Sequence, residues 1–256
     1  MYCIGIDIGS TAAKTVVLGD RKLKFVLPAG WNSRETAGAI RNSLIQEGID
    51  PASPDTRIAA TGYGRSAVDY ADYVITEITC HARGARALAG DSCGVIDVGG
   101  QDTKVILVQD KMVQDFLMND KCSAGTGKFL EIMANRLNVT IGELFELARK
   151  GTPVPISSLC TVFAESEVIS LMGEGQSREN IAAGVVNSVA EKVAQLAGRK
   201  KLPQNVLLTG GLSGEPYFAE KLSEKLHQQI TAAEDGKYAG ALGGALLAAE
   251  RSQSCL

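Results

Sequence analysis

The stretch GVIDVGGQDTKVILV, residues 94–108, repeats the pattern of IGIDIGSTAAKTVVL, residues 4–18. Three residue types recur at a constant offset of 90 positions, in the pairs Asp7 and Asp97, Gly9 and Gly99, and Lys14 and Lys104. Each copy is an apolar run, an Asp-x-Gly step, a polar turn and a second apolar run, which is typical of a β-hairpin with a glycine-rich turn. Two such hairpins at one offset predict duplicated half-domains that face each other across a cleft.

Glycine-rich turns of this kind suit the binding of phosphate groups. Glycines let backbone N–H groups come close to an anion, and an aspartate at the end of a strand can hold a hydrated Mg²⁺ ion. A third element, NVLLTGGLSG at 205–214, is an apolar strand that enters a Gly-Gly turn and could pass close to an adenosine. Taken alone, each of these elements would also suit an ordinary turn or a strand-to-helix loop.

The composition excludes several classes of protein. The 256 residues, 45% of them hydrophobic, allow one large or two small domains with a real core. A net charge of −3 and 5% aromatic residues argue against nucleic acid binding. MYCIGIDIGS at the N-terminus lacks the basic and apolar regions of a signal peptide, and YAGALGGALLAA at 238–249 is too short to span a membrane. We therefore expect a cytoplasmic protein that binds neither nucleic acid nor membrane.

Five motifs together resemble a known family. DIGST (7–11), DVGGQDTK (97–104) and LLTGG (207–211), in this order, resemble the two phosphate motifs and the adenosine motif of the actin/Hsp70/sugar-kinase ATPase superfamily. Together with NDKCSAGTGKF (119–129) and SSLCTVFAESEVISL (157–171), the set resembles the activator (component A) of 2-hydroxyacyl-CoA dehydratases. It also resembles the related ATPase subunits of benzoyl-CoA reductases, the BadF/BadG/BcrA/BcrD type. The resemblance covers nearly the whole chain.

The resemblance implies an α/β fold of two ribonuclease-H-like (actin/Hsp70-type) domains, with ATP in the cleft between them. We expect residues 1–91 plus 236–256 to form the first domain, and residues 92–235 to form the second, which contains the candidate cluster cysteines. KYAGALGGALLAAE, at 237–250, has a face of small residues that permits close packing on the first half. The resemblance implies such a return of the chain, so we expect the first domain to be discontinuous.

The motif match also implies roles for individual residues. Asp7 and Asp97 would organise Mg²⁺ through water, and Gln101 or Asp102 would orient the attacking water, as a glutamine does in other NTPases. The residues expected to contact ATP or ADP are Ser10, Thr11, Ala12, Ala13, Lys14, Asp97, Gly99, Gly100, Gln101, Gly125, Thr126, Gly127, Gly210, Gly211 and Lys237. The segment SAGTGK is no Walker A loop, since Phe129 rather than Ser or Thr follows Lys128.

Cys122 and Cys160 are the candidate metal ligands. Each is followed by apolar residues at helical spacing, and the dipole and free N–H groups of a helix N-terminus favour a thiolate or an anionic cluster. A cubane iron–sulfur cluster normally takes four cysteine ligands, and this chain has two well-placed ones. The simplest solution is a homodimer that shares one [4Fe–4S] cluster on its two-fold axis. The family resemblance implies the same arrangement.

Other interpretations of the cysteines stay open at this point. Most lone cysteines are small buried hydrophobic residues, and we expect this of Cys3, Cys80 and Cys93. A zinc site is the alternative metal site, but two cysteines without a nearby histidine are a poor zinc set. His81 and His227 lie outside both cysteine motifs, and we expect each to be a polar surface residue or a helix cap.

The function that the resemblance implies is ATP-dependent transfer of a low-potential electron. A reduced ferredoxin or flavodoxin would be the donor, ATP would change the angle between the domains, and the acceptor would be an iron–sulfur dehydratase or reductase of anaerobic metabolism. One alternative is a small-molecule kinase of the same fold, which needs a hydroxyl-bearing substrate. Another is a cytoskeletal or scaffold protein that polymerises with nucleotide. Both alternatives predict a protein without iron.

Overall fold

The computed structural model describes residues 1–157 and 160–253, which form two compact units. One unit comprises Met1–Cys93, Ile106–Phe116 and the segment that begins at Asp235. The other comprises Gly94–Val105 and Leu117–Glu234. Ile106–Phe116 falls in the first unit, whereas the sequence analysis assigned it to the second domain; the domain limits proposed there stay a prediction.

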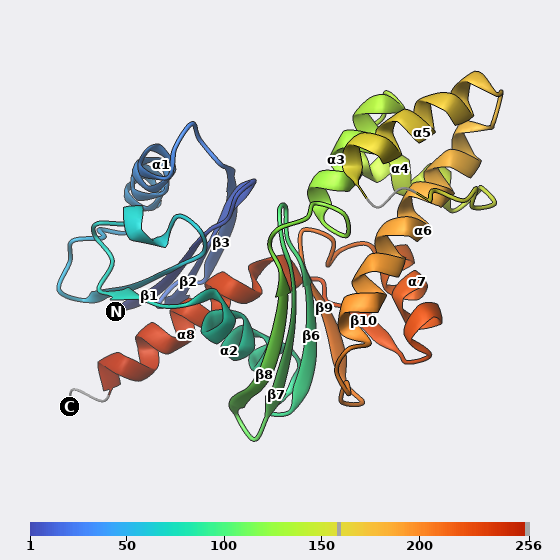
Figure 1. The fold of residues 1–256 in the computed structure, drawn as a ribbon. Coiled ribbons are helices and arrows are strands. Elements are labelled where there is room, and N and C mark those ends of the chain that lie inside the picture. The colour runs from blue at the N-terminus through green and yellow to red at the C-terminus, as the bar shows by residue number, and fades with distance from the viewer. Residues whose placement is uncertain (158–159, 254–256) are drawn as a thin grey trace. The chain divides into compact units, whose positions relative to one another are not determined.

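The first sheet has five strands in the order β3-β2-β1-β4-β5 (Figure 1). β1 (Tyr2–Ile8) pairs antiparallel with β2 (Ala12–Gly19), which pairs antiparallel with β3 (Leu23–Pro28). On its other side β1 pairs parallel with β4 (Thr56–Thr61), and β4 pairs parallel with β5 (Tyr73–Val74).

The second sheet repeats this topology. Its strands are β6 (Cys93–Val98), β7 (Thr103–Gln109), β8 (Met112–Asn119), β9 (Val206–Gly210) and β10 (Ile230–Ala232). Their order is β10-β9-β6-β7-β8, and β9 runs parallel to both β6 and β10. Read in reverse, the order is β8-β7-β6-β9-β10. Strand for strand, it corresponds to the order β3-β2-β1-β4-β5 of the first sheet. The repeat predicted from the sequence is therefore confirmed as a repeated strand topology.

The two glycine-rich turns are built alike. Gly9 N donates to Ala12 O at 3.2 Å, and Gly99 N donates to Asp102 O at 2.9 Å. Each of these bonds closes a four-residue turn at the end of the first strand of its sheet. The predicted hairpin at DIGST is confirmed by the antiparallel register of β1 and β2, in which Ile8 lies opposite Ala13.

The helical segments of the first unit are α1 (Ser33–Gln46), η1 (Arg65–Ala67), α2 (Glu77–Ala89), η2 (Gly236–Tyr238) and α8 (Ala239–Gln253). α1 covers one face of the first sheet, where its buried side chains pack with alternate residues of β1 in a core that includes Ile4, Ile6, Ile8, Ile40 and Leu44. The opposite face of the same sheet packs against α8.

α8 makes backbone contact with its neighbours. A Cβ atom on Gly243 would lie 1.8 Å from Cys80 O in α2, and one on Gly5 would lie 1.8 Å from Ala241 O. Side chains at these two glycines would therefore separate α8 from α2 and from β1. The close packing predicted from the small residues of this helix is confirmed.

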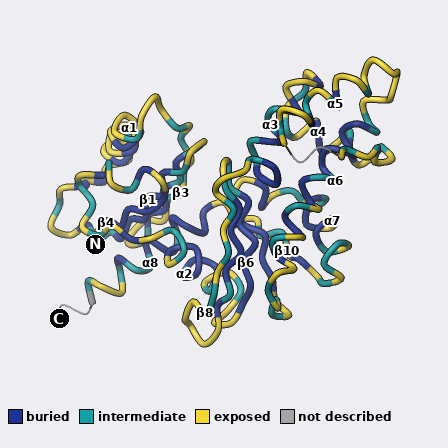
Figure 2. Tube along the Cα trace, viewed as in Figure 1, coloured by how far each residue is buried: buried dark blue, intermediate teal, exposed yellow. Residues whose placement is uncertain are grey.

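The helices of the second unit are α3 (Gly127–Arg136), α4 (Ile141–Ala148), α5 (Thr161–Gly173), α6 (Arg178–Ala197) and α7 (Pro216–Leu226). α4 begins at a capping box, in which the side chains of Thr140 and Glu143 each bond the other's backbone. α6 supplies much of the core of this unit, as Figure 2 shows by its buried colour. No described helix has both the length and the apolar character that crossing a lipid bilayer requires.

Candidate functional site

A buried group of charged and polar residues lies at the end of β6. Thr209 Oγ1 donates to Asp97 Oδ1 at 2.8 Å, and Lys104 Nζ lies 3.5 Å from Asp97 Oδ2. Lys104 Nζ also lies 2.7 Å from Asp102 Oδ2. Asp97 and Lys104 are only 2% and 3% exposed, so this ion-pair network is desolvated and holds the turn at 99–102 in place.

The first unit contains the same row of residue types. In the strand registers, Asp7 lies opposite Lys14 on β2 and beside Thr61 on β4. Asp7 is 5% exposed, and Lys14 Nζ donates to Ala12 O in the turn at 3.4 Å. Each unit thus places an aspartate between a lysine and a threonine, next to a glycine-rich turn.

Asp7 lies against two glycines and a histidine. A Cβ on Gly62 would lie 2.5 Å from Asp7 Oδ1, and a Cβ on Gly240 would lie 2.6 Å from Asp7 Oδ2 and 2.9 Å from His81 Nε2. The Asp7 carboxylate and the His81 imidazole therefore meet at Gly240 of α8. The expectation of a surface role for His81 is wrong: it is 6% exposed because α8 covers this side of α2.

The second histidine behaves as predicted. His227 is the C-cap of α7 and has the left-handed conformation, with φ 52°. It lies outside the groups of residues described above and caps a helix end.

The remaining residues of the second turn lie close to this network. Gly99 and Gly100 are half-buried, and Gln101 is exposed at the tip of the turn. Gly210, with φ 82°, ends β9, and a Cβ there would lie 3.0 Å from Asp97 Oδ1. Gly211 N donates to Val98 O at 3.0 Å. The structure therefore brings the Gly-Gly turn predicted for adenosine to the end of β6.

The corresponding residues of the first unit lie at the end of β1. Ser10 and Thr11 are exposed in the turn, Ala12 is half-buried, and Ala13 is buried opposite Ile8. Lys237 lies elsewhere in the same unit, on η2, with its Nζ 5.3 Å from the centre of the Tyr238 ring. Its contact with adenosine stays a prediction.

The start of α3 is bonded to the second turn. Gly127 N donates to Gly99 O at 2.9 Å, and Lys128 N donates to Gly100 O at 2.8 Å. A Cβ on Gly127 would lie 3.1 Å from Gly99 O, so glycine permits this close approach. The structure thus joins Gly127 to the predicted phosphate turn.

Gly125 and Thr126, unlike Gly127, are hydrogen-bonded to residues outside the turn at 99–102. Thr103 Oγ1 donates to Gly125 O at 2.7 Å, and Thr103 points to the face of the sheet opposite to Lys104, since side chains alternate along a strand. Thr126 is buried, and its hydroxyl donates to Ser123 O at 2.7 Å. The structure does not bring Gly125 to the Asp97 carboxylate, and a nucleotide contact by either residue stays a prediction.

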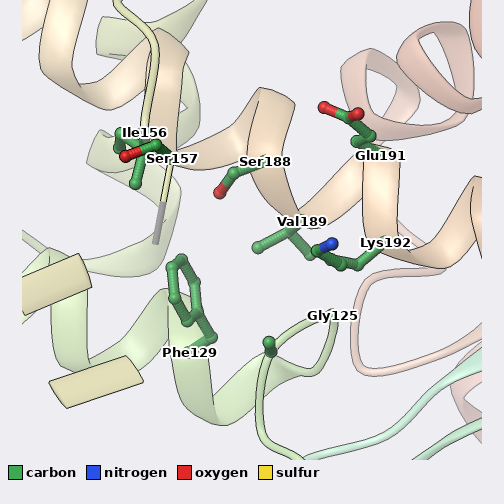
Figure 3. Close-up of a pocket in the computed structure, with 9 residues that line it drawn as sticks. Gly125, Phe129, Ile156, Ser157, Ser188, Val189, Glu191 and Lys192 are labelled. Carbon is green, nitrogen blue, oxygen red and sulfur yellow. The ribbon is translucent and has the colours of Figure 1, made fainter. Parts of the chain in front are cut away.

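Two cavities border Gly125 on its α6 side. In one, of about 240 Å³, the ring of Phe129 and the side chains of Ser188 and Val189 point into the space above Gly125 (Figure 3). The other, of about 440 Å³, lies between α6 and the segment that contains Cys122. The second is also lined by Thr103, and neither includes a residue of the turn at 99–102.

The two candidate metal ligands lie in neighbouring segments. Cys160 is the N-cap of α5, as the sequence predicts, while Cys122 lies four positions before Thr126, the N-cap of α3. Ser123 Oγ and Thr161 Oγ1 are 2.7 Å apart. The residues that directly follow the two cysteines are therefore hydrogen-bonded to each other, although they are 38 positions apart in the chain.

The cysteines divide into two groups by exposure. Cys122 and Cys160 are exposed free thiols, whereas Cys3, Cys80 and Cys93 are buried, as predicted. Burial raises the pKa of the Cys80 thiol to about 12, which keeps it protonated. Burial also raises the pKa values of Cys3 and Cys93. The three buried thiols are therefore poor metal ligands.

The donor set fits a cluster that is shared between chains. Over residues 1–157 and 160–253, no three His, Cys, Asp or Glu side chains gather as a metal-binding group. Two exposed thiols on adjacent segments supply half of the four ligands that a cubane cluster takes. Ser158 and Leu159, which belong to the second cysteine motif, lie outside the described residues.

Three residues near the predicted sites were missed by the sequence analysis. Lys104 aligns with Lys14 in the repeat, so the repeat itself could have identified it. Thr209 directly precedes the predicted Gly-Gly turn, and its neighbour Asp97 was predicted. His81 had no local indication, because its approach to Asp7 depends on the packing of α2, β1 and α8.

Comparison with known proteins gives the family. The model of the "BadF/BadG/BcrA/BcrD ATPase family" matches residues 4–248. The (R)-2-hydroxyglutaryl-CoA dehydratase activating ATPase of Acidaminococcus fermentans is 42% identical, over 98% of each chain. The activator of lactoyl-CoA dehydratase of Anaerotignum propionicum is 42% identical, over 99% of each chain.

Solved structures agree with the fold. The activator of the 2-hydroxyisocaproyl-CoA dehydratase from Clostridium difficile, with bound ADPNP, has a TM-score of 0.91 at 37% identity, over 100% of this chain and 98% of that one. A ROK family glucokinase from Streptomyces griseus has a TM-score of 0.62 at 18% identity, over 98% of this chain and 100% of that one. The α/β fold is thus that of the actin/Hsp70/sugar-kinase ATPases.

Proposed function

The chain belongs to the BadF/BadG/BcrA/BcrD ATPase family, and on this basis we propose that it uses ATP to activate a partner iron–sulfur dehydratase or reductase by low-potential electron transfer. Relatives that match over nearly their whole length are named as activators of three different acyl-CoA dehydratases. One of the benzoyl-CoA reductase subunits of Thauera aromatica is 32% identical. These names support an activator role, with a ferredoxin or flavodoxin as the proposed donor.

The observation that carries the proposal is the pair of exposed thiols beside the Ser123–Thr161 hydrogen bond. Cys122 and Cys160 of two copies of the chain would hold one [4Fe–4S] cluster. When bound, that group would supply one-electron redox chemistry at low potential. The hydroxyl pair would fix the distance between the two ligands of one chain, as outer-sphere hydrogen bonds do at other metal sites.

The residues of the two turns would bind Mg–ATP. Backbone N–H groups of each turn would hold phosphates, and Asp7 and Asp97 would hold hydrated Mg²⁺. Asp102 is ion-paired with Lys104, whereas Gln101 is exposed. Gln101 is therefore better placed to orient the attacking water, and Asp102 would hold the buried lysine.

Hydrogen bonds connect the predicted phosphate turn with the segments that contain the two thiols. The carbonyls of Gly99 and Gly100 accept hydrogen bonds from the first residues of α3, and the segment that precedes α3 contains Cys122. The Ser123–Thr161 bond continues this route to Cys160. A nucleotide-dependent movement of the turn would thus move both ligands, which is a physical basis for coupling between two sites.

The first experiment is a measurement of iron and acid-labile sulfide per chain on anaerobically purified protein, together with its oligomeric mass. We expect about two irons per chain in a homodimer, because one cubane holds four irons. An iron-free protein after careful reconstitution would contradict the electron-transfer proposal. In that case the small-molecule kinase of the same fold becomes the function to test, with a search for a phosphorylated product.

Removal of the hydroxyl pair should loosen the metal site without affecting hydrolysis. The double variant Ser123→Ala, Thr161→Val keeps nearly the same side-chain volumes but loses the hydrogen bond. We expect about tenfold faster loss of iron to a chelator, by analogy with other outer-sphere substitutions. Ser166→Ala is the matched control, because that hydroxyl bonds Val162 O of its own helix. Equal iron loss in both variants would contradict the positioning role.

A further inference from the structure

The one tryptophan of the chain is exposed to solvent on the loop that precedes α1. Trp31 is 92% exposed. Its backbone is nevertheless held firmly: Trp31 N donates to Glu35 Oε2 at 3.0 Å, and Gly30 N donates to Thr36 Oγ1 at 2.9 Å. Asn32 caps the helix that follows. The loop therefore holds the backbone of Trp31 in a defined position. The indole ring itself buries almost none of its surface against the rest of the chain.

A second exposed aromatic residue lies on the adjacent loop. Tyr63 is 73% exposed between two glycines. A Cβ on Gly64 would lie 2.8 Å from Ser33 Oγ, so the Tyr63 segment lies against the start of α1, two residues after Trp31. Trp and Tyr residues dominate the binding energy of many protein interfaces. Two exposed aromatic residues on neighbouring segments therefore favour an interface.

A positively charged hollow is lined by residues of the two segments that follow Trp31 and Tyr63 in the chain. It is about 370 Å³ in volume, and its lining includes Arg34, Gly38 and Arg41 of α1 together with Ser66 and Asp69 of the adjacent loop. In the part of the chain that the structure describes, neither arginine forms an ion pair with a carboxylate. With a single carboxylate, that of Asp69, against two guanidinium groups, the hollow is net positive.

The walls of the hollow are also pre-formed. Tyr70 OH donates to Ala37 O at 2.8 Å, and the Arg41 guanidinium lies 5.8 Å from the centre of the Tyr70 ring. Gly38 lies in the middle of α1, where glycine destabilises a helix relative to alanine. No atom lies within 4 Å of a Cβ built at this position, so packing does not require the glycine, and its missing side chain deepens the hollow.

We propose that Trp31, Tyr63 and the hollow lined by Arg34, Gly38 and Arg41 bind an acidic segment of a partner protein. Arginine and aromatic residues are the types enriched at the centres of interfaces, and two guanidinium groups complement carboxylates. The chain as a whole has a net charge of −3, so this local positive charge is opposite to its average. Much of the outer side of α1 is exposed (Figure 2).

The test uses Trp31 as a single-site reporter in the full-length protein. A short glutamate-rich peptide is titrated in, with a lysine-rich peptide and inorganic phosphate as comparison probes. We expect a saturable blue shift of the emission with the glutamate-rich peptide alone, because the indole leaves water. Higher salt should weaken binding, since exposed charges are screened.

Substitutions in the hollow test whether peptide binding, measured by the tryptophan emission, takes place there. Arg34→Gln with Arg41→Gln should raise the Kd at least about tenfold, a change of about 1.4 kcal/mol. Gly38→Leu should fill the hollow and weaken binding, while thermal unfolding stays unchanged or shifts upward. Arg178→Gln with Lys201→Gln, at two exposed positions of the other unit, is the charge-matched control and should bind as the parent does.

Several outcomes would overturn the proposal. An equal response to the lysine-rich peptide would mean nonspecific contact with the indole. Saturation by phosphate alone would make the hollow a small-anion site, and self-association that the arginine variants abolish would make it an interface between copies. Unchanged peptide affinity in Gly38→Leu, with the fold intact, would remove the hollow from the interface. The test does not depend on the metal site, so it can fail or succeed separately from the proposed function.

Discussion

If Cys122 and Cys160 hold the proposed cluster, replacement of both with serine is expected to abolish iron binding and leave ATP binding nearly unchanged. Serine lacks the thiolate that iron–sulfur clusters require. Both positions are exposed, so the substitutions leave no cavity in the core. We expect iron to fall from about two per chain to near zero, measured on anaerobically reconstituted protein, with the affinity for ATP measured by calorimetry on the same samples.

The matched control for this result is Cys93→Ala. Cys93 is a buried thiol of β6, and burial raises its pKa, so its removal should leave the iron content unchanged. Single variants of the two ligands should each lose the cluster, because a shared site would then lack two of its four thiolates. A double variant that retains its full iron content would exclude both residues as ligands.

The second large effect is expected at Asp7. Asp7→Asn keeps the size of the side chain between Gly62 and Gly240 but removes its charge. Loss of one positioned electrostatic group in an active site typically lowers the rate about a hundredfold or more, and we expect such a loss in Mg²⁺-dependent ATP hydrolysis. Steady-state hydrolysis measured over a range of Mg²⁺ concentrations should also show a weaker dependence on the metal.

Two further readouts separate a catalytic role of Asp7 from a structural one. The iron content of Asp7→Asn should stay at the parent level, because Asp7 and the two cysteines belong to different units. Asp55→Asn, an exposed carboxylate of the same unit, should hydrolyse ATP at the parent rate. Combined loss of iron, folding and activity in Asp7→Asn would show that the aspartate is structural instead.

The duplicated hairpin, which occurs once in each sheet, is the part of the fold that the sequence predicted best. The offset of 90 positions relates Asp7 to Asp97, and the strand orders of the two sheets repeat in the same way. A hairpin depends on alternation along a strand and on glycine in the turn, which are properties of neighbouring residues. The capping box at Thr140 and Glu143 was predictable for the same reason.

The site residues divide in the same way. Local patterns predicted some of them, and contacts between distant segments determined the others. The sequence placed Asp97 and Gly99 at a turn, and the structure has them there. It did not indicate that Lys104 bonds Asp102 as well as Asp97. It also did not indicate that Thr103 Oγ1 donates to Gly125 O, on the face of β7 opposite to Lys104; the nucleotide contact expected of Gly125 stays a prediction.

By itself, then, the sequence determined the duplicated hairpins and the helical segments that follow the two cysteine motifs, since each depends on residues a few positions apart. The α/β class followed from the family resemblance of its motifs. Only the tertiary structure decided that His81 meets Asp7, that Ser123 bonds Thr161, and that Gly38 of α1 lines a hollow together with Ser66 and Asp69. These contacts depend on how segments that are distant in the chain come together. They exist because whole helices pack against whole sheets, and that geometry is a property of the complete core rather than of any local pattern.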